Sequence, residues 1–449
     1  MALKISNTLT RSKEKFIPID EKNIRMYVCG PTVYDYPHVG NARPLIVFDL
    51  LFRLLSKIYP NSKVTYVRNI TDIDDKIIEA SNKSKISIQD LTSKVTKDFH
   101  DDCNYLGCLN PTIEPKATEH LNEMINLIKK LIQNDFAYES NGHVYFQVTK
   151  FKKYGNLSNK KIEELISGSR VEVSDNKKEP GDFVLWKPSK ENEPSWDSPF
   201  GKGRPGWHLE CSAMSEKYLG NHFDIHGGGL DLIFPHHENE IAQSVCANNN
   251  EKFSNYWLHN GYVTVEKQKM SKSLGNFITI NELKKNYNGQ VVRLAMLSTH
   301  YTQPFDWNEN ILDVSQKSLD KWYEFYSDDK EAISEENFKF LLDDLNTPLM
   351  ISNIHELYKK AKTGDSLSAK QLSSSCKILG LFNQTHDEWK NFKKKIGKIT
   401  AEEIEKLISE RDKARSKKDF KTSDEIRDLL VSKGVLIKDK DGITTWEYK

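Results

Sequence analysis

The sequence predicts an α/β protein whose largest domain is built on a parallel β-sheet. Near the N-terminus, strand patterns at 24–29 and 63–68 flank a helical pattern at about 41–58, which is the spacing of a parallel β-α-β unit. The same pattern returns later, where a strand at 223–226 is followed by a helix that opens at Pro235. We therefore expect a Rossmann-type sheet assembled from two separate parts of the chain.

The segment between these two parts, 111–205, is expected to form a small inserted connective subdomain. Strand patterns lie on either side of Asn141-Gly142, a pair that favours the tight turn of a β-hairpin. On this division, residues 1–110 and 206–305 are the first and second halves of the sheet domain.

Two further units are expected after the sheet domain. Residues 306–389 have an almost wholly helical pattern, which predicts a helical bundle. Residues 390–449 begin with a lysine-rich stretch and continue with two helical segments and two strands around a turn at 441–442. This pattern predicts a small C-terminal α+β module.

Length and composition indicate a folded protein of several domains. A chain of 449 residues is too long for one compact core. Its 29 % charged and 37 % apolar residues are not the composition of a disordered chain. The formal net charge is only +1, so a nucleic acid partner would have to bind a local basic patch.

The sequence also predicts where the protein is found. The N-terminal residues lack the apolar core of a secretory signal, and no apolar run is long enough to span a membrane. The six cysteines are sparse and irregularly spaced, unlike those of a disulfide framework. We therefore expect a cytoplasmic protein with no membrane association.

Candidate phosphate-binding residues lie at the start of the first helix. Gly40 would let a phosphate approach the backbone, and the helix N-terminus favours an anion. His38 and Asn41 can both donate hydrogen bonds there. The alternative is an ordinary helix start with a histidine on the surface.

A lysine-containing loop, residues 269–273, follows a strand expected at 258–265. Lys269 and Lys272 can bracket a triphosphate and stabilise the charge that develops on departing pyrophosphate. A solvated lysine loop is the alternative, and composition alone favours it.

Soft metal ligands lie at the ends of predicted strands and helices. Cys29 ends the first strand, Cys211 lies in the second half of the sheet domain, and Glu240 lies on the helix after Pro235. His236 and His237 both share a helix face with Glu240, so spacing does not choose between them. Two thiolates, one imidazole and one carboxylate would form a zinc site, whereas buried, unreactive cysteines are the alternative.

The two phosphate-binding segments, taken in order, resemble the motifs of class I aminoacyl-tRNA synthetases. Those motifs are written His-Ile-Gly-His, after the first strand, and Lys-Met-Ser-Lys-Ser, after a late strand. Residues 269–273 match the second motif at every position. The first motif departs at its fourth position, where Asn41 replaces histidine, and this affects one contact without affecting the class.

Four longer segments narrow the resemblance to one family, the cysteinyl-tRNA synthetases. They are residues 27–34, 69–76, 205–212 and 226–240, and the similarity extends over essentially the whole chain. It implies an enzyme that activates L-cysteine with ATP and Mg²⁺ and transfers it to tRNA(Cys). It also implies one zinc ion per chain, held by Cys29, Cys211, His236 and Glu240, and thereby selects His236 over His237.

The resemblance also implies roles for other residues. Lys272, with Lys269 secondary, and His38 are expected to act on the phosphates during adenylate formation. Further ATP contacts are expected from Gly40, Asn41, Gly227, Gly228, Gly229 and Asp231. Gly30, Thr71 and Trp207 are expected to shape the amino acid pocket, with plain core packing as the alternative for Trp207.

A metal suits a site that must select cysteine. Serine and alanine are about the same size, and an apolar pocket separates such small differences by only roughly 1–3 kcal/mol. Zinc binds a thiolate far better than a hydroxyl. Selection at this step requires no editing domain, and the insertion is small for one.

The C-terminal module is expected to bind RNA. Residues 390–449 hold seventeen Lys and Arg against twelve Asp and Glu. Trp446, in a predicted strand, would offer a base a stacking platform, and a packed tryptophan is the alternative.

We expect a monomer. Two rival functions are a cysteine ligase acting on an amino sugar and a non-catalytic zinc- or nucleotide-binding paralogue; the C-terminal module argues against the first, and the intact lysine loop against the second.

Overall fold

The computed structural model describes residues 2–160, 176–249, 252–270, 274–328, 333–396, 401–417, 419–440 and 443–448. Its centre is a four-stranded parallel sheet in the order β10-β9-β3-β4. The strands are β3 (Asn23–Val28), β4 (Lys63–Arg68), β9 (Phe223–Gly229) and β10 (Ser254–Asn260). The α/β class and the parallel sheet built from two halves are thereby confirmed.

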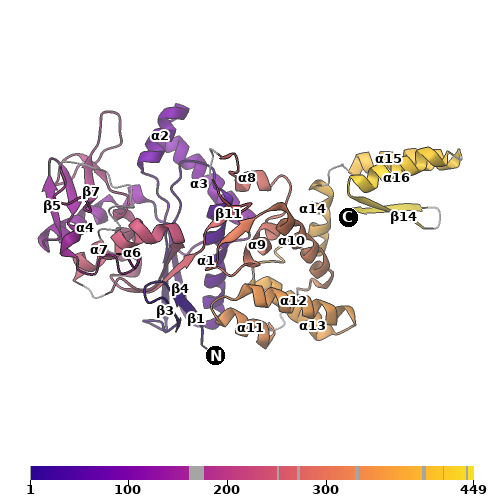
Figure 1. Ribbon diagram of the computed structural model, residues 1–449, viewed down its shortest axis with the longest axis horizontal. Coiled ribbons are helices and arrows are strands. Elements are labelled where there is room, and N and C mark those ends of the chain that lie inside the picture. Colours follow the sequence, from indigo (N-terminus) through magenta and orange to yellow (C-terminus); the bar gives the residue numbers. More distant parts are fainter. Residues whose placement is uncertain are drawn as a thin grey trace.

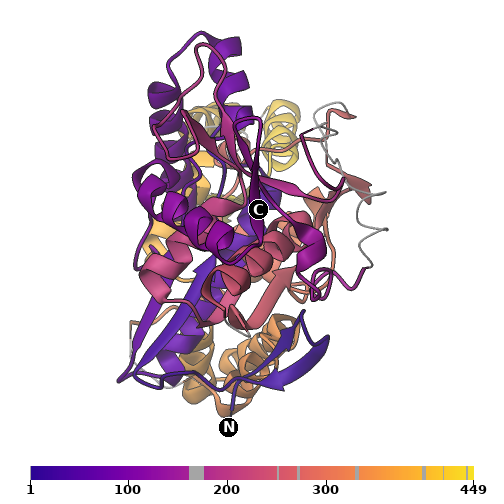
Figure 2. The same cartoon turned by 90° about the vertical axis from the view of Figure 1, so that its left-hand side faces the viewer.

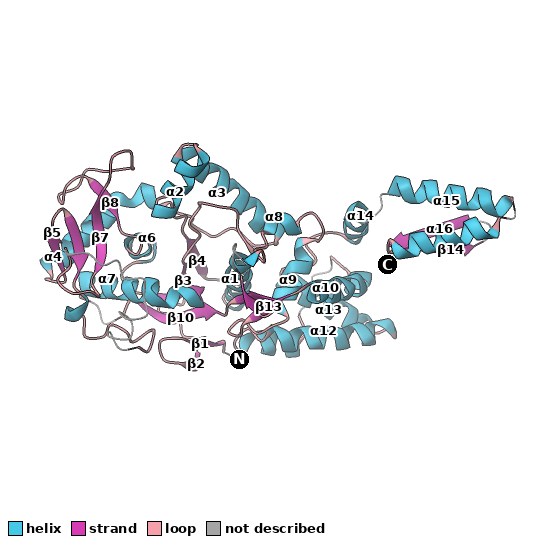
Figure 3. Ribbon diagram, turned by 45° about the horizontal axis from the view of Figure 1, so that its top comes forward, coloured by secondary structure: helices cyan, strands magenta, loops and turns pink. Residues whose placement is uncertain are grey.

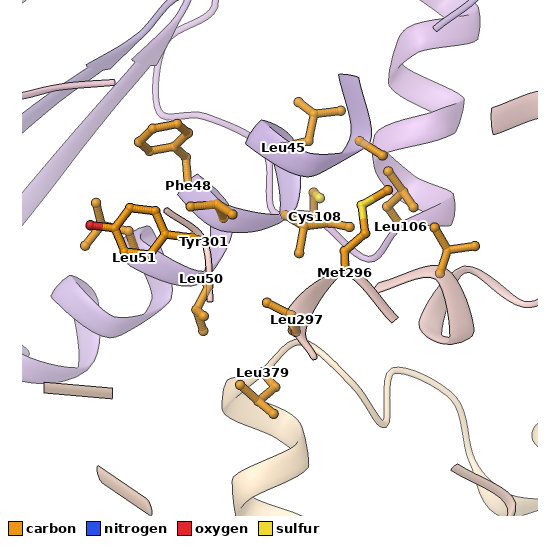
Figure 4. Packing of buried hydrophobic residues seen from close by; sticks show 14 of the residues in the cluster. Leu45, Phe48, Leu50, Leu51, Leu106, Cys108, Met296, Leu297, Tyr301 and Leu379 are labelled. Atoms are coloured by element: carbon orange, nitrogen blue, oxygen red, sulfur yellow. The ribbon is translucent and has the colours of Figure 1, made fainter. Parts of the chain in front are cut away.

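The long helix α1 (Val39–Ile58) connects β3 to β4 and packs against the sheet. All residues from Leu45 to Leu51 are buried, so the middle of the helix is covered on every side. Figure 4 shows Leu45, Phe48 and Leu51 of α1 close to Met296, Leu297 and Tyr301 from the later part of the chain. The helix therefore lies between the sheet and the helical region.

The strand order places a topological switch point at the middle of the sheet. β3 and β9 are neighbours, and the chain leads from β3 outward to β4 and from β9 outward to β10. In open parallel sheets, ligands bind beyond the carboxyl ends of the strands at such a point. Cys29 follows one of these strand ends, and Gly227 to Gly229 form the other.

The inserted segment forms a second, antiparallel sheet beside the first, with strand order β5-β6-β7-β8. Figure 2 shows it at the end of the molecule that faces the viewer. Asn141 and Gly142 both have positive φ, as a two-residue hairpin turn requires, so the predicted hairpin is present. Its elements, with the helices before it, are α2 (Asp75–Ser84), α3 (Ile88–Tyr105), α4 (Leu121–Gln133), β5 (Ala137–Ser140), β6 (His143–Phe146), β7 (Phe183–Pro188) and β8 (Gly203–Pro205).

The prediction of one continuous strand over residues 258–265 is wrong. β10 ends at Asn260, and β11 (Val263–Val265) belongs to another sheet, with β12 (Gln268–Lys269) and β13 (Phe305–Trp307). Gly261 lies at the break, where a Cβ atom would come within 2.4 Å of the Gln303 carbonyl oxygen. The chain bends there because only glycine fits so close to another backbone.

The remaining helices form the bundle beside α1, and the C-terminal module lies beyond it, at the far end from the inserted sheet (Figures 1 and 3). α14 (His386–Ile396) lies between the two, and the module has its own small core around Ile404 and Leu430. The other elements of these regions are α8 (Ile280–Leu283), α9 (Gly289–Leu297), α10 (Glu309–Trp322), α11 (Glu335–Leu342), α12 (Thr347–Lys362), α13 (Ser366–Ile378), α15 (Ala401–Ser416), α16 (Phe420–Ser432), β14 (Val435–Lys440) and β15 (Ile443–Tyr448). A hairpin of β1 (Lys4–Asn7) and β2 (Ser12–Lys15) precedes β3.

None of the helices in the described part of the chain combines the length and the apolarity that spanning a bilayer requires.

A buried ion pair lies where helices α1, α9 and α13 meet. Arg293 of α9 is fully buried and pairs with Asp49 of α1. The same guanidinium donates to the carbonyl oxygens of Leu106, at 3.3 Å, and Leu379, at 2.5 Å. One side chain thus links the end of α3, helix α1, helix α9 and the end of α13.

We expect Arg293→Ala to lower the free energy of unfolding by about 3 kcal/mol, the low end for breaking a buried ion pair, because Asp49 keeps Arg53 as a partner at 2.8 Å. Urea denaturation followed by tryptophan fluorescence measures this as a lower midpoint. The matched control is Lys339→Ala, which removes an exposed pair with Glu335 and should cost about 0.5 kcal/mol or less. Equal midpoints for the two variants would contradict the role given to Arg293.

Candidate active site

Four potential metal ligands converge at the switch point. They are Cys29, Cys211, His236 and Glu240, and their ligand atoms all lie within 4.8 Å of one another. The Cys29 sulfur lies 3.3 Å from Oε1 of Glu240, and Nε2 of His236 lies 3.0 Å from the same oxygen. The structure thus brings together the four residues predicted as zinc ligands.

Each ligand is held by a different element. Cys29 directly follows β3, and Cys211 lies in the first turn of α6 (Leu209–Leu219). Glu240 lies in the first turn of α7 (Glu238–Asn248). The helix predicted to open at Pro235 begins three residues later, because the backbone of Phe234 is extended (φ −135°, ψ 132°) and residues 233–237 form an irregular turn. His236 lies in this turn and still contacts Glu240.

A second set of four ligands overlaps the first. Cys29, His226, His237 and Glu240 also lie within 4.8 Å of one another. His237 lies 4.0 Å from Oε1 of Glu240, and its Nδ1 is 2.7 Å from Nε2 of His259. His226 contacts the other carboxylate oxygen, Oε2, at 2.8 Å. The first set has two sulfur ligands and the shorter histidine contact, so we prefer it for a zinc ion.

Burial and mutual contacts shift the pKa values of the ligand groups in different directions. Burial opposes ionisation of Glu240, but the charges of His226 and His236 hold its pKa well below its usual range. Burial also opposes ionisation of Cys211, yet hydrogen bonds from Cys29 and interactions with His236 lower its pKa to about 7. Burial and the contact with Cys211 raise the pKa of the Cys29 thiol. A metal would therefore find two ready anions and would displace the proton of one thiol.

The donor set fits zinc. Thiolate, imidazole and carboxylate are zinc's usual protein ligands, whereas Ca²⁺ and Mg²⁺ prefer oxygen. On a tetrahedral zinc with bonds of about 2.0–2.3 Å, ligand atoms lie roughly 3.3–3.8 Å apart. The separations here are close to that range, so only small movements would be needed to surround an ion.

Further histidines, which the sequence did not single out, orient the ligands. His226 lies 2.8 Å from Glu240 Oε2, and its ring stacks on Trp257 at a centroid distance of 4.4 Å. His208 Nδ1 lies 3.0 Å from His236 Nδ1, which leaves Nε2 of His236 facing Glu240. Such outer contacts fix the orientation of metal ligands. The sequence signal was the density of histidines in the motifs around 208, 226 and 236, but only the fold shows their contacts.

Gly30, Thr71 and Trp207 lie around the metal cluster. The Gly30 N–H donates to Oδ1 of Asn69 at 2.9 Å, and a Cβ at Gly30 would lie 1.6 Å from the Asn69 carbonyl oxygen. Asn69 in turn donates to the Thr71 hydroxyl at 3.1 Å. Trp207 stacks on His236 at 4.5 Å and is 40 % exposed, which is not the burial of a core residue. Of the three, Trp207 is exposed, whereas Thr71 is 2 % exposed.

Glu210, next to Cys211, is a further buried carboxyl group that the sequence did not single out. It is 2 % exposed, and burial together with the neighbouring Cys211 raises its pKa well above the usual range. Its carboxyl group lies near Thr71.

The predicted phosphate-binding residues cap helix α1. The Gly40 N–H donates to Nδ1 of His38 at 3.1 Å, and the His38 N–H donates to Oδ1 of Asn41 at 3.0 Å. Because Nδ1 of His38 accepts, the ring proton lies on Nε2. A Cβ at Gly40 would lie 2.8 Å from the His38 ring, so glycine allows the ring to fold over the helix start.

The second predicted motif begins beside the first. The segment after it pairs with the helix start: the Val39 N–H donates to the Ile278 carbonyl at 3.0 Å, and the Ile280 N–H donates to that of Pro37 at 3.0 Å. The Met270 methyl would lie 3.4 Å from a Cβ at Gly40. Lys269 ends strand β12, whereas its side chain and all of Lys272 lie outside the described residues.

The glycines at the end of β9 are required mainly by internal packing. A Cβ at Gly227 would lie 2.2 Å from the Phe48 ring, and one at Gly228 would lie 2.9 Å from the His237 ring. Gly229 is partly exposed and Asp231 is exposed, so these two residues offer contact to a ligand. Trp446, the predicted RNA contact, lies far from this site in the C-terminal module, where its Nε1 donates to Glu405 at 2.6 Å.

Comparison with known proteins agrees with this geometry. The profile of the tRNA synthetases class I (C) catalytic domain matches residues 15–317, and that of the cysteinyl-tRNA ligase anticodon binding domain matches residues 400–446. The cysteine–tRNA ligase of Pelagibacter ubique is 57 % identical over 447 residues, which is 99 % of each chain. That of Rickettsia prowazekii is 49 % identical over 459 residues, again 99 % of each chain. The chain belongs to the cysteine–tRNA ligase family.

Solved structures of lower identity share the fold. Mycobacterium tuberculosis methionyl-tRNA synthetase in complex with methionyl-adenylate superimposes with a TM-score of 0.54 at 12 % identity, over 82 % of this chain and 93 % of that one. A putative arginyl-tRNA synthetase from Campylobacter jejuni gives the same score at 10 % identity, over 80 % of this chain and 93 % of that one. The resemblance to class I synthetases stated from the two motifs is therefore confirmed at the level of family and fold.

We expect His226→Asn to weaken zinc binding about 10- to 100-fold, because it removes the partner that orients Glu240. Competition with a chromophoric chelator measures the affinity. His222→Asn is the matched control: this histidine precedes the same strand and contacts Asn255 at 2.8 Å, away from the cluster. Cys211→Ser, which removes a ligand outright, should lose the ion. Unchanged affinity in His226→Asn would rule out the orienting role.

Proposed function

We propose that the protein is a ligase that activates L-cysteine with ATP and transfers it to tRNA(Cys). The observation that carries the proposal is the cluster of Cys29, Cys211, His236 and Glu240 beside the capped start of α1, at the switch point of the sheet. One end of the site offers thiophilic ligands and the other a phosphate site. A substrate with a thiol and a carboxylate that attacks ATP would span the two.

Zinc, one ion per chain, is the metal that the four ligands would hold. When bound, it would supply a strong bond to the substrate's thiolate and only a weak one to a hydroxyl, which separates cysteine from serine. Trp207 would cover the side chain of the amino acid, and Gly30 with Thr71 would leave room for it. Selection by the metal ligands is thereby distinct from the chemistry on the phosphates.

The phosphates of Mg²⁺-ATP would lie at the N-terminus of α1. Nε2 of His38 would donate to a phosphate oxygen, and the helix start with Gly40 and Asn41 would favour the negative charge. Lys272, and secondarily Lys269, would neutralise the charge on departing pyrophosphate. Adenosine would lie over the end of β9, with Gly229 and Asp231 the most open positions there; for Gly227 and Gly228 internal packing explains the glycine without a ligand.

The tRNA would be read by the C-terminal module, with Trp446 as a stacking platform. Its hairpin is held to α15 by Arg411, whose guanidinium pairs with Asp439 at 2.8 Å, and the hydrogen bonds from Arg411 hold the pKa of that carboxyl well below its usual range. This pair keeps the hairpin and the helix as one surface. A cytoplasmic location and a monomeric state stay predictions.

Cysteine-dependent charging of tRNA by the purified protein tests the function against its rivals. Charging of tRNA(Cys) with cysteine, and not with serine, is the expected result. Formation of adenylate without charging would favour the ligase that acts on an amino sugar. Absence of both reactions in zinc-loaded protein would favour a binding paralogue and would refute the proposal.

We expect Lys272→Ala to slow adenylate formation by two or more orders of magnitude, on the order of what one charge-stabilising donor contributes. ATP–pyrophosphate exchange measures the rate, and zinc content should stay unchanged because the lysine is no metal ligand. Lys267→Ala, two residues before the loop, is the matched control and should exchange normally. A normal exchange rate in Lys272→Ala would refute the role of this lysine.

A further inference from the structure

A pocket of about 800 Å³ lies on a different side of α7 from the metal cluster. It is bounded by the turn of the β1–β2 hairpin, the loop at 151–160, helix α7 and the start of β10. On α7, Ile241 and Val245 line this pocket, and they lie roughly 100–140° around the helix from Glu240. The pocket is therefore separate from the proposed cysteine site, although one helix borders both.

The floor of the pocket is apolar and its rim is basic. Phe151, Val245, Phe253 and Trp257 are nearly fully buried and form the floor. The rim carries four exposed cations, Arg11, Lys153, Lys160 and Lys252. An apolar floor beneath several positive charges fits a ligand that has an apolar, preferably aromatic, body and an anionic group.

Among the described residues that line the pocket, the one carboxylate, that of Glu238, does not neutralise this rim. Glu238 is fully buried and accepts hydrogen bonds from the backbone of Gly155 and Ser158 and from the Ser158 hydroxyl, each at 2.9 Å. Its charge is satisfied by the loop that it holds in place. Arg11, in contrast, is oriented toward the loop by one bond to the Asn156 carbonyl, at 2.9 Å. The walls are thus fixed by hydrogen bonds. Glu14, outside the pocket, interacts with Lys252, so the four cations of the rim still outnumber these two carboxylates of the described residues.

We propose that this α7 pocket is a second binding site, for a small molecule with an aromatic body and a phosphate, sulfonate or carboxylate group. Its volume lies in the range of about 300–1,000 Å³ typical of small-molecule sites. An RNA backbone would use exposed cations without a buried apolar floor, so a small ligand accounts for both features. This inference goes beyond the proposed ligase function and does not rest on it.

The site borders the cysteine-binding machinery through two contacts. Trp257, in the floor, stacks on His226, which contacts Glu240. Tyr154, in the wall, donates to Oδ1 of Asn239, the residue before Glu240. A ligand in the α7 pocket would touch both side chains.

The probe for the test is 8-anilinonaphthalene-1-sulfonate, an aromatic anion that fluoresces when it binds an apolar site. It is titrated into the full-length, zinc-loaded protein, with Mg²⁺-ATP in saturating amount so that the nucleotide site is occupied. We expect one saturable site per chain. Ile241→Trp, which fills the pocket, and the double variant Lys160→Glu with Lys252→Glu, which reverses two rim charges, should each weaken binding at least tenfold.

Matched controls make the assignment specific. Val314→Trp adds the same ring at an exposed position of α10, and Lys339→Glu reverses a charge on α11; both should bind the probe like the unmodified protein. The double charge variant should keep its zinc and its charging rate, which separates this result from any failure of the proposed function. Unchanged binding in Ile241→Trp and in the charge variant would overturn the proposal. Competitive displacement of the probe by tRNA would also overturn it and assign the surface to RNA.

Discussion

The pairing of β3 with β9 is the constraint on which the rest of the site depends. Tyr27 pairs with His226 and Val28 with Gly227, and the Cys29 N–H donates to the Gly227 carbonyl at 3.2 Å. Strands from distant parts of the chain thereby end side by side, and the metal ligands that follow them meet. Gly227 also sets the position of α1, because its missing side chain leaves room for Phe48 against the sheet. His38 lies at the start of this same helix, so the packing of α1 on the sheet also positions the proposed phosphate-binding residues.

Sequence reasoning predicted the parallel sheet, the Asn141-Gly142 hairpin and four ligands that the structure brings together. The sheet and the hairpin could be predicted because strand periodicity and turn chemistry are local properties of the sequence, whereas the full ligand set came from the family resemblance. The strand expected at 258–265 is wrong, since the close approach of Gly261 to Gln303 is a long-range contact that no local pattern encodes. The role of His226 was missed for the same reason. Helix spacing did not decide whether His236 or His237 is the metal ligand, and the family resemblance was needed to choose between them.

Two faces of helix α7 lie in different environments, one polar and one apolar. The face with Glu240 lies in a dense group of histidines, where burial lowers the pKa of His237 well below its usual range and that of His208 to about 3. These rings are neutral, so they act as hydrogen-bond donors and acceptors while Glu240 carries the charge. The other face, with Ile241 and Val245, forms part of an apolar floor under a basic rim. Because Glu238 ties the same helix to the loop at 155–158, a movement of that loop would reach the first turn of α7, which is where Glu240 lies.

The replacement of histidine by Asn41 in the first motif has a physical explanation in the helix cap. Oδ1 of Asn41 accepts the His38 N–H, while Nδ1 of His38 accepts the Gly40 N–H, so the two side chains satisfy backbone donors reciprocally. In this arrangement the Asn41 amide caps the start of the helix. The hydrogen bond at Nδ1 of His38 orients the ring and therefore the N–H at Nε2. Backbone hydrogen bonds from Val39 to Ile278 and from Ile280 to Pro37 then hold the segment that follows the second motif against this cap. Asparagine at position 41 thus completes the cap of α1, and in the proposed phosphate site the donors would be His38 and the backbone of α1.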